Sequence, residues 1–230
     1  MRDNSSYKKN GVLILFSGGM DSIAATVLLA SEFSRIRLLT CNPPYVLGCR
    51  SLTADTIRKL RQQFPDVEIT QTFESNLPLL RELHPGRAVR EIRSSLGLCT
   101  ACKLSIHLRA IEVCRRKGLH HASSGIGVLD QQKFPDQLPE LEVRVNRLYA
   151  EAGIERLSPL DGRTKAEVKE LLEPLGLFPK LRIPRCLAKH FQELWWFYFG
   201  WAKDERILAW YDSQLLLLEK KLRDMGSADA

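Results

Sequence analysis

Short apolar runs alternate with amphipathic stretches through the first part of the chain. The runs at 12–16, 36–40 and 67–70 have the length of buried strands, whereas residues 23–30 and 52–64 carry apolar side chains at helical spacing. Parallel neighbours in a sheet need a crossover between them, and a helix is the usual crossover. The pattern therefore predicts an α/β fold, a parallel sheet covered by helices.

The same alternation continues further along the chain. Helical periodicity returns from Cys102, on a face formed by Leu104, Leu108, Ile111 and Cys114. Residues 119–125 predict a fourth strand with its loop, and residues 141–152 predict another helix. A last helix is expected from Thr164 to Gly176, because Thr164-Lys165-Ala166-Glu167 has the sequence of a capping box.

Residues 77–98 follow neither pattern. Pro78, Pro85 and Gly86 interrupt the segment, and four arginines make it basic: Arg81, Arg87, Arg90 and Arg93. We expect either a solvated connection or a lid over a bound ligand.

The end of the chain is rich in aromatic residues, most of them in 191–210, and no proline interrupts 185–230. One or two helices are expected there. Their aromatic surface can pack against the sheet domain or a second copy of the chain, or can stack bases. We predict a basic tail at 1–10, one domain at 11–186 and a helical extension at 187–230, with a homodimer formed through that extension.

Composition narrows the class of protein. The 230 residues carry a formal net charge of 34 − 27 = +7, which permits contact with a polyanion such as RNA. The sequence has no apolar run long enough to span a membrane and no secretory signal at its start, so a cytoplasmic protein is expected. The six cysteines then favour metal binding or thiol chemistry over a disulfide framework.

The first strand leads into Ser17-Gly18-Gly19-Met20-Asp21-Ser22 and then into a helix. Glycines let backbone N–H groups approach a phosphate closely, and a helix N-terminus favours negative charge. Ser17 and Ser22 add hydroxyl donors, and Asp21 can orient a metal ion or an attacking group. Ligands of parallel sheets bind at the carboxyl ends of strands, which makes Thr40 and Gly125 further candidates for nucleotide contact.

The order Ser-Gly-Gly-x-Asp-Ser resembles the PP-loop of the N-type ATP pyrophosphatase superfamily. The resemblance implies an adenine nucleotide α-hydrolase-like sheet between helices, and an enzyme that splits ATP, with Mg²⁺, into AMP and pyrophosphate. Residues 158–168 resemble the family's Pro-Leu…Lys-x-Glu-Val segment, in which Lys165 would help to hold the nucleotide phosphates.

A second constellation consists of cysteines. Cys99 and Cys102 form a Cys-x-x-Cys pair just before the helix predicted from Cys102, and Cys186 lies in a later loop. Two thiolates at this spacing can hold one metal, or one can resolve a bond formed by the other. Three cysteines leave a metal site one ligand short, which suits an iron–sulfur cluster with one open iron. Zinc remains possible with His190, His120 or His121 as a fourth ligand, and two buried thiols can also bind nothing.

Together, the loop and the cysteines resemble the sulfur-transferring branch of the PP-loop superfamily, which includes cluster-dependent tRNA thiolation enzymes and small-molecule sulfur insertases. The resemblance implies an adenylated acceptor oxygen that sulfur replaces, a 4Fe-4S cluster, a tRNA or small-molecule acceptor, and a sulfide or persulfide donor. The implied catalytic residues are Asp21, Lys165, Cys99, Cys102 and Cys186, with the three cysteines as cluster ligands.

Three other functions fit parts of this pattern. An amide ligase or nitrile synthase would use ammonia, with zinc at the cysteines. A reductase-like protein would bind an adenylyl sulfate without cleaving ATP. A nucleotide-sensing protein would bind ATP and catalyse nothing.

Overall fold

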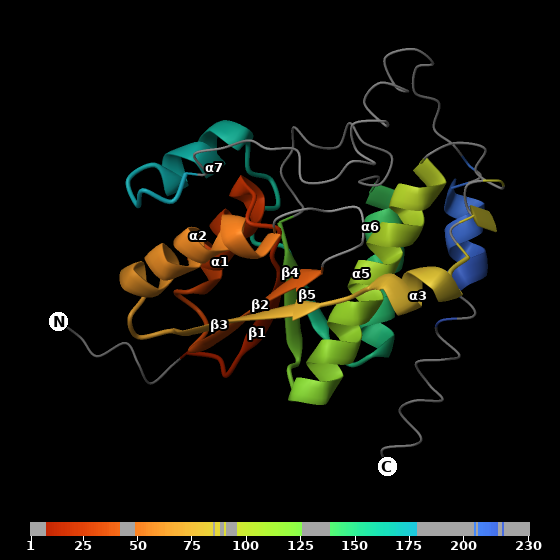
Figure 1. Cartoon of the computed structure of the whole chain (residues 1–230), viewed down its shortest axis with the longest axis horizontal. Helices are drawn as coiled ribbons and strands as arrows, with labels where there is room; N and C mark the ends of the chain where they lie inside the picture. The colour runs from red at the N-terminus through yellow and green to blue at the C-terminus, as the bar shows by residue number, and fades with distance from the viewer. Residues whose placement is uncertain are drawn as a thin grey trace.

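The computed structural model describes residues 8–41, 49–84, 86–87, 90, 96–125, 139–178, 205, 207–215 and 218. Within them, five strands form one sheet in the order β3-β2-β1-β4-β5, and every neighbouring pair is parallel. The strands are β1 (Val12–Leu15), β2 (Arg35–Cys41), β3 (Glu68–Glu74), β4 (His121–Ser124) and β5 (Glu155–Leu157). The predicted α/β fold with a parallel sheet is confirmed (Figure 1).

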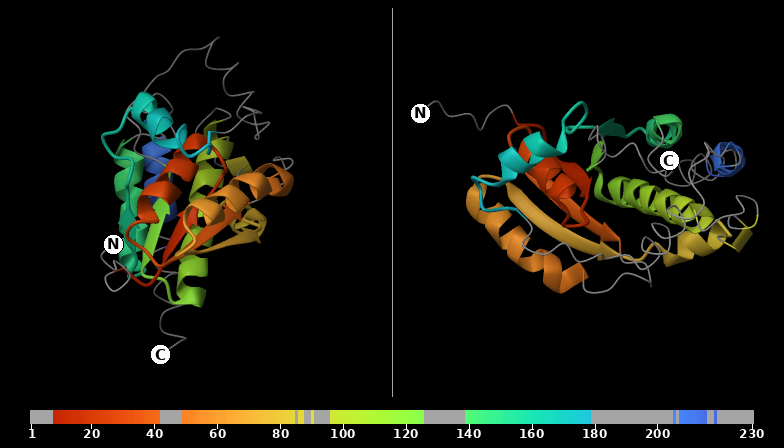
Figure 2. Two further views of the ribbon diagram at one scale, coloured as in Figure 1. Left: turned by 90° about the vertical axis from the view of Figure 1, so that its left-hand side faces the viewer. Right: turned by 90° about the horizontal axis from the view of Figure 1, so that it is seen from above.

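Helices cover both faces of the sheet (Figures 1 and 2). One face carries α1 (Met20–Leu29), α2 (Cys49–Gln63) and α7 (Lys165–Leu172); the other carries α3 (Leu77–Glu82), α5 (Leu96–Lys117) and α6 (Pro139–Glu151). Successive residues of β1 point to opposite faces, so Leu13 packs with α5 and α6 while Ile14 packs with α1 and α2. Each face therefore has its own hydrophobic core.

The helix that carries the cysteine pair begins earlier than expected. It starts at Leu96, so the prediction that Cys99 and Cys102 precede the helix is wrong. The first turns are anchored by small side chains, because Thr100 and Ala101 are fully buried. A search for large apolar residues at helical spacing misses such a face. The face predicted from Leu104 to Cys114 is buried, as expected.

Two elements were not predicted. Helix α3 lies in the segment expected to be a connection or a lid, and Leu79, Leu80 and Leu83 anchor it in the core. Pro78 does not prevent this helix because proline is tolerated in a first turn. Strand β5 has only three residues at the edge of the sheet, which is too short for a recognisable pattern.

The capping box at Thr164 is present. The Thr164 hydroxyl accepts a hydrogen bond from the Glu167 backbone N–H, and the Glu167 carboxylate accepts one from the Thr164 backbone N–H at 2.6 Å. We expect Thr164→Ala to lower the free energy of unfolding by about 1 kcal/mol, measured by urea denaturation. Thr164→Ser keeps the hydroxyl and should stay at the wild-type value; an equal loss in both variants would contradict a capping role.

Part of the aromatic extension packs on its own chain. Residues 207–215 are helical, and Trp210 and Tyr211 are buried in the core that contains α5 and α6. Arg144 of α6 donates two hydrogen bonds to the Asp212 carboxylate, at 2.6 and 2.7 Å. The other aromatic residues of 191–204 lie outside the described residues, and the predicted domain boundaries and homodimer stay predictions. No helix among the described residues is both long and apolar enough to cross a membrane.

Candidate nucleotide and cysteine site

The loop after β1 forms a tight turn into α1. Gly18 has a φ of 70°, a conformation that favours glycine, and α1 begins at Met20. The Gly19 backbone N–H donates to the Ser17 hydroxyl at 3.2 Å, and the Ser22 hydroxyl donates to the Gly19 carbonyl at 3.0 Å. Asp21 lies in the first turn of the helix. The motif thus has the strand–turn–helix context that an anion site requires.

This loop lies where the order of the sheet reverses. The chain moves from β1 outward to β2 and β3, then returns to β4 on the other side of β1. Loops that leave β1 and β4 diverge at such a switch point, and the space between them is the usual ligand site of open α/β sheets.

Gly125, at the end of β4, closes that site from the other side. A Cβ atom added to Gly125 would lie 2.7 Å from the Asp21 carbonyl carbon and 2.7 Å from the Ser22 backbone nitrogen. Only glycine fits against the backbone there. The structure therefore brings Gly125 together with the predicted nucleotide loop.

Thr40 and Lys165, the two other residues predicted to contact the nucleotide, lie outside the loop at 17–22. The Thr40 side chain is buried; its hydroxyl donates to the Phe16 carbonyl at 2.8 Å and accepts from Gln71 at 3.0 Å. Thr40 thus joins the ends of β1 and β2 beneath the loop. Lys165 is exposed at the first position of α7, which packs against α1. Their contacts with nucleotide stay predictions.

The cysteine pair lies in the first turns of α5. Cys99 and Cys102 are half-buried thiols three residues apart, so they share one face of the helix. The fully buried Asn76 donates from Nδ2 to the Ser105 hydroxyl at 2.7 Å and to Cys102 Sγ at 3.8 Å. Amide donors to sulfur commonly support thiolate ligands, so this donor set fits two ligands of an iron–sulfur cluster.

A third thiol lies near the pair. Cys41, at the end of β2, packs on the same core as Cys102. Burial, together with the neighbouring Cys102 and Glu74, raises the pKa of Cys41 to about 12 against the opposing effect of Arg109. Cys41 is therefore a neutral thiol. Cys114 is buried in the core, as predicted.

The histidines considered for a zinc site lie elsewhere. His121 opens β4 at the amino end of the sheet, with its Nε2 3.4 Å from a Glu155 carboxylate oxygen. The part of α5 between the cysteines and its end at Lys117 separates the two sites by about 23–27 Å along the helix. Hence neither His120 nor His121 completes a site with Cys99 and Cys102. Among the described residues no cluster of three or more metal-ligating side chains occurs; Cys186 and His190 lie outside them.

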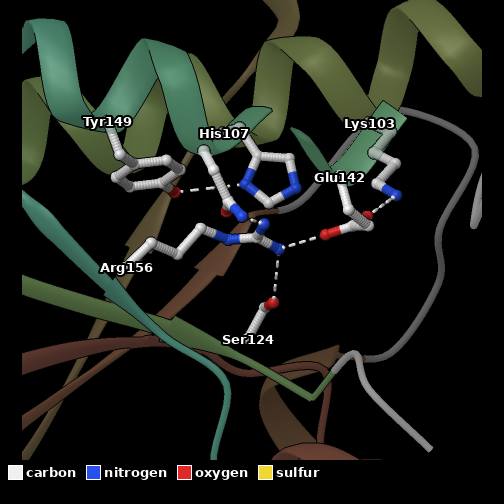
Figure 3. Close-up of polar contacts among 7 residues, drawn as sticks. Lys103, His107, Ser124, Glu142, Tyr149 and Arg156 are labelled. Carbon is white, nitrogen blue, oxygen red and sulfur yellow. Dashed lines mark hydrogen bonds and ion pairs between the residues drawn. The ribbon is translucent and has the colours of Figure 1, made fainter. Parts of the chain in front are cut away.

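A charged network connects the cysteine helix to the end of β4 (Figure 3). Glu142 of α6 accepts from Lys103 at 2.5 Å and from Arg156 at 2.7 Å. Arg156, whose side chain is 4% exposed, also donates to the Ser124 hydroxyl at 3.0 Å and to Asn146 at 2.6 Å. Lys103 follows Cys102, and Ser124 precedes Gly125. The network therefore links the helix of the cysteine pair to Ser124, the residue before Gly125, and Gly125 in turn lies against the loop at 17–22.

Neutral groups complete this region. His107 Nδ1 lies 3.1 Å from the Tyr149 hydroxyl, and Arg156 lies over the Tyr149 ring. Burial, with a smaller effect from Arg156 and Lys103, holds the pKa of His107 well below its ordinary value. His107 is thus neutral, so the two cations Lys103 and Arg156 face the single carboxylate of Glu142.

The carboxylate of Glu142 makes stability depend on pH. Burial favours its neutral form, but Lys103 and Arg156 outweigh burial and lower its pKa below the ordinary 4.5. A lowered pKa stabilises the fold above 4.5, and that stabilisation is lost as the pH falls through the folded-state pKa.

We therefore expect Glu142→Gln to lower the free energy of unfolding by about 2 kcal/mol near neutral pH. The difference from wild type should shrink as the pH falls below 4.5, because the wild-type carboxylate then becomes protonated. Urea denaturation across this range measures it. Glu151→Gln, at the exposed end of α6, is the matched control. A difference that does not change with pH would contradict the charge network.

The sequence did not indicate Asn76, Glu142 or Arg156. Their roles depend on contacts between residues that are distant in sequence, made by the pairing of β4 with β5 and by the packing of α3 on α5. The only local signal was a pair of charged residues, Glu155 and Arg156, inside the short run 154–157, which follows the helix-ending Gly153.

The sheet order, the switch point and the glycine loop define an α/β fold in which helices cover both faces of an all-parallel sheet and a glycine turn lies at the switch point. No sequence family matches the chain, and no curated protein matches it. Its structure is similar to that of a 4-thiouridine synthetase in complex with RNA and bound ATP, with 17% identity and a TM-score of 0.59. The similarity covers 93% of this chain and 53% of the synthetase, so the chain spans about half the synthetase's length.

A second similar structure is the U34-tRNA thiolase NcsA from Methanococcus maripaludis, solved with its 4Fe-4S cluster. Its TM-score is 0.49 and its identity 19%, over 90% of this chain and 73% of the thiolase. The similarity to the synthetase confirms the fold expected from the Ser-Gly-Gly motif.

Proposed function

We propose that this protein is an ATP-dependent sulfurtransferase that adenylates an oxygen of an RNA nucleoside and replaces it with sulfur. One observation carries the proposal: the nucleotide loop and the cysteine pair lie at the same edge of the sheet, joined by the network of Lys103, Glu142 and Arg156. The similarity to a synthetase solved with RNA and ATP supports an enzyme of this type. We place it in the cytoplasm, and small-molecule acceptors are the alternative.

The loop supplies the binding of ATP. Backbone N–H groups of residues 17–22 at the start of α1 would hold the pyrophosphate end, assisted by the hydroxyls of Ser17 and Ser22. Lys165 would contact the phosphates from α7, and Asp21 would hold Mg²⁺. Preorganised donors of this kind stabilise the charge that develops as the acceptor oxygen attacks the α-phosphorus.

The cysteines supply the sulfur step. Cys99 and Cys102 would hold an iron–sulfur cluster with Cys186 as the third ligand, and the cluster, when bound, would keep sulfide ionised for attack on the adenylated carbon. Asn76 orients Cys102 through its amide N–H. Lys103 and Arg156 together carry one positive charge more than Glu142 neutralises, and this charge would favour the anionic nucleotide.

Metal analysis and ATP products test this function. Protein purified without oxygen should be brown and contain iron and sulfide, and RNA together with sulfide should make it release AMP and pyrophosphate. Colourless protein with stoichiometric zinc would favour an amide ligase or nitrile synthase instead. ATP binding without any acceptor-dependent pyrophosphate release would contradict an adenylating enzyme.

A further inference from the structure

A row of basic side chains lies beyond α3. Arg81, His84, Arg87 and Arg90 follow one another at intervals of three residues and line, with Gly86, a surface pocket of about 560 Å³. All four basic residues are exposed, and none of the described residues lining the pocket is acidic. We propose that this pocket binds a phosphodiester group of the RNA acceptor, an inference that rests on the proposed function.

Local structure explains why these side chains gather. The opposite face of α3 is fixed in the core by Leu79, Leu80 and Leu83, which leaves Arg81 directed outward. The chain then turns at His84, whose φ is 46°. Beyond this turn residues 86, 87 and 90 are again helical, and Arg87 and Arg90 line the same pocket as Arg81 and His84.

Backbone hydrogen bonds link the first three basic residues, Arg81, His84 and Arg87. The His84 N–H donates to the Arg81 carbonyl at 3.0 Å, and the Arg87 N–H donates to the His84 carbonyl at 2.8 Å. The basic groups are thereby presented as one surface, continuous with a helix that is anchored in the core. A ligand would meet a preformed row of donors there.

The chemistry of the row selects a phosphate. Arginine keeps its charge at every physiological pH and presents a planar fork of N–H donors that matches phosphate oxygens. Phosphate contacts dominate the affinity of proteins for nucleic acids. A neutral small-molecule acceptor offers no group that would use three guanidinium groups.

The position of the pocket also suits an acceptor that reaches the cysteines. Helix α3 packs on α5, beside which it lies in Figure 1, and begins directly after Asn76, the residue that donates to Cys102. Arg81 follows Asn76 by five residues, about 8 Å along a helix. A phosphate held at Arg81 would thus leave a neighbouring base of the same RNA strand near Cys102.

Charge reversal tests the pocket. Arg87→Glu and Arg90→Glu should each weaken binding of a fluorescein-labelled RNA hairpin about tenfold at low salt, measured by anisotropy, and reduce the slope of log affinity against log salt by about 1. Arg58→Glu makes the same charge change at a side chain that is 63% exposed on α2, and should alter binding much less. Affinity for ATP should be unchanged in all three variants.

The two proposals fail differently. If the wild-type protein binds the hairpin and the Arg87 and Arg90 variants bind as tightly as the Arg58 variant, the pocket is not the phosphate site and the proposed function stands. If the wild-type protein binds neither the hairpin nor unfractionated tRNA, both the proposed RNA acceptor and the proposed phosphate site are wrong. Should a glutamate variant lose its fold by circular dichroism, Arg87→Ala gives the same test with a smaller expected loss.

Discussion

Gly125→Ala should weaken ATP binding and reduce the rate of pyrophosphate release about 100-fold, the loss of rate expected when a reacting group is displaced by about 1 Å. The added methyl group would meet the Asp21 carbonyl carbon and the Ser22 nitrogen at 2.7 Å. These are backbone atoms in the first turn of α1, so the clash is relieved only by moving the nucleotide loop or β4. Isothermal titration with ATP and a pyrophosphate-release assay measure the effect.

The matched control lies on the same strand. Ser123 is buried, and its hydroxyl has no hydrogen-bond partner among the described residues. Ser123→Ala removes an atom rather than adding one, and should leave ATP affinity within about twofold of wild type. If Gly125→Ala bound ATP as tightly as Ser123→Ala, Gly125 would not define the nucleotide site.

Cys99→Ala and Cys102→Ala should each reduce RNA thiolation to the background of a reaction without protein, while ATP binding is retained. A cluster that loses one of its ligands is no longer held in place, whereas the nucleotide loop is built from different elements. Cys186→Ala is expected to have the same effect. Thionucleoside content of the RNA and ATP titration are the two measurements, and iron content reports the ligand loss separately.

Cys114 provides the control for this series. It lies on the same helix, is fully buried in the core, and has a pKa raised to about 12 by burial. Cys114→Ala should cost about 1 kcal/mol of stability and keep both iron and thiolation. Full thiolation by Cys99→Ala or Cys102→Ala would remove that residue from the proposed cluster site.

Much of the fold could be predicted because its elements carry strong local patterns. The first three strands, α1, α2, α6 and the Thr164 cap each have a regular apolar spacing or a start signal in the sequence. The start of α5 and the short β5 could not be predicted in this way. The first is anchored by Thr100 and Ala101, and the second is defined by its pairing with β4 rather than by its own residues.

The candidate site was predictable only in its local part. Residues 17–22 form one continuous motif, and Gly125 was indicated by its place after a strand. Arg156 and Glu142 meet because α6 and β5 lie beside each other, and Asn76 meets Cys102 because α3 packs on α5. Such contacts depend on tertiary packing, which no spacing within a segment encodes.

Sulfur incorporation into RNA tests the central claim most directly. Anaerobic protein would be incubated with ATP, Mg²⁺, isotopically labelled sulfide and tRNA, and the nucleosides and adenine nucleotides would then be quantified by mass spectrometry. The proposed function predicts a nucleoside in which labelled sulfur replaces oxygen, with one AMP formed for each sulfur transferred. Formation of AMP without sulfur in the RNA, or cleavage of ATP to ADP, would contradict it.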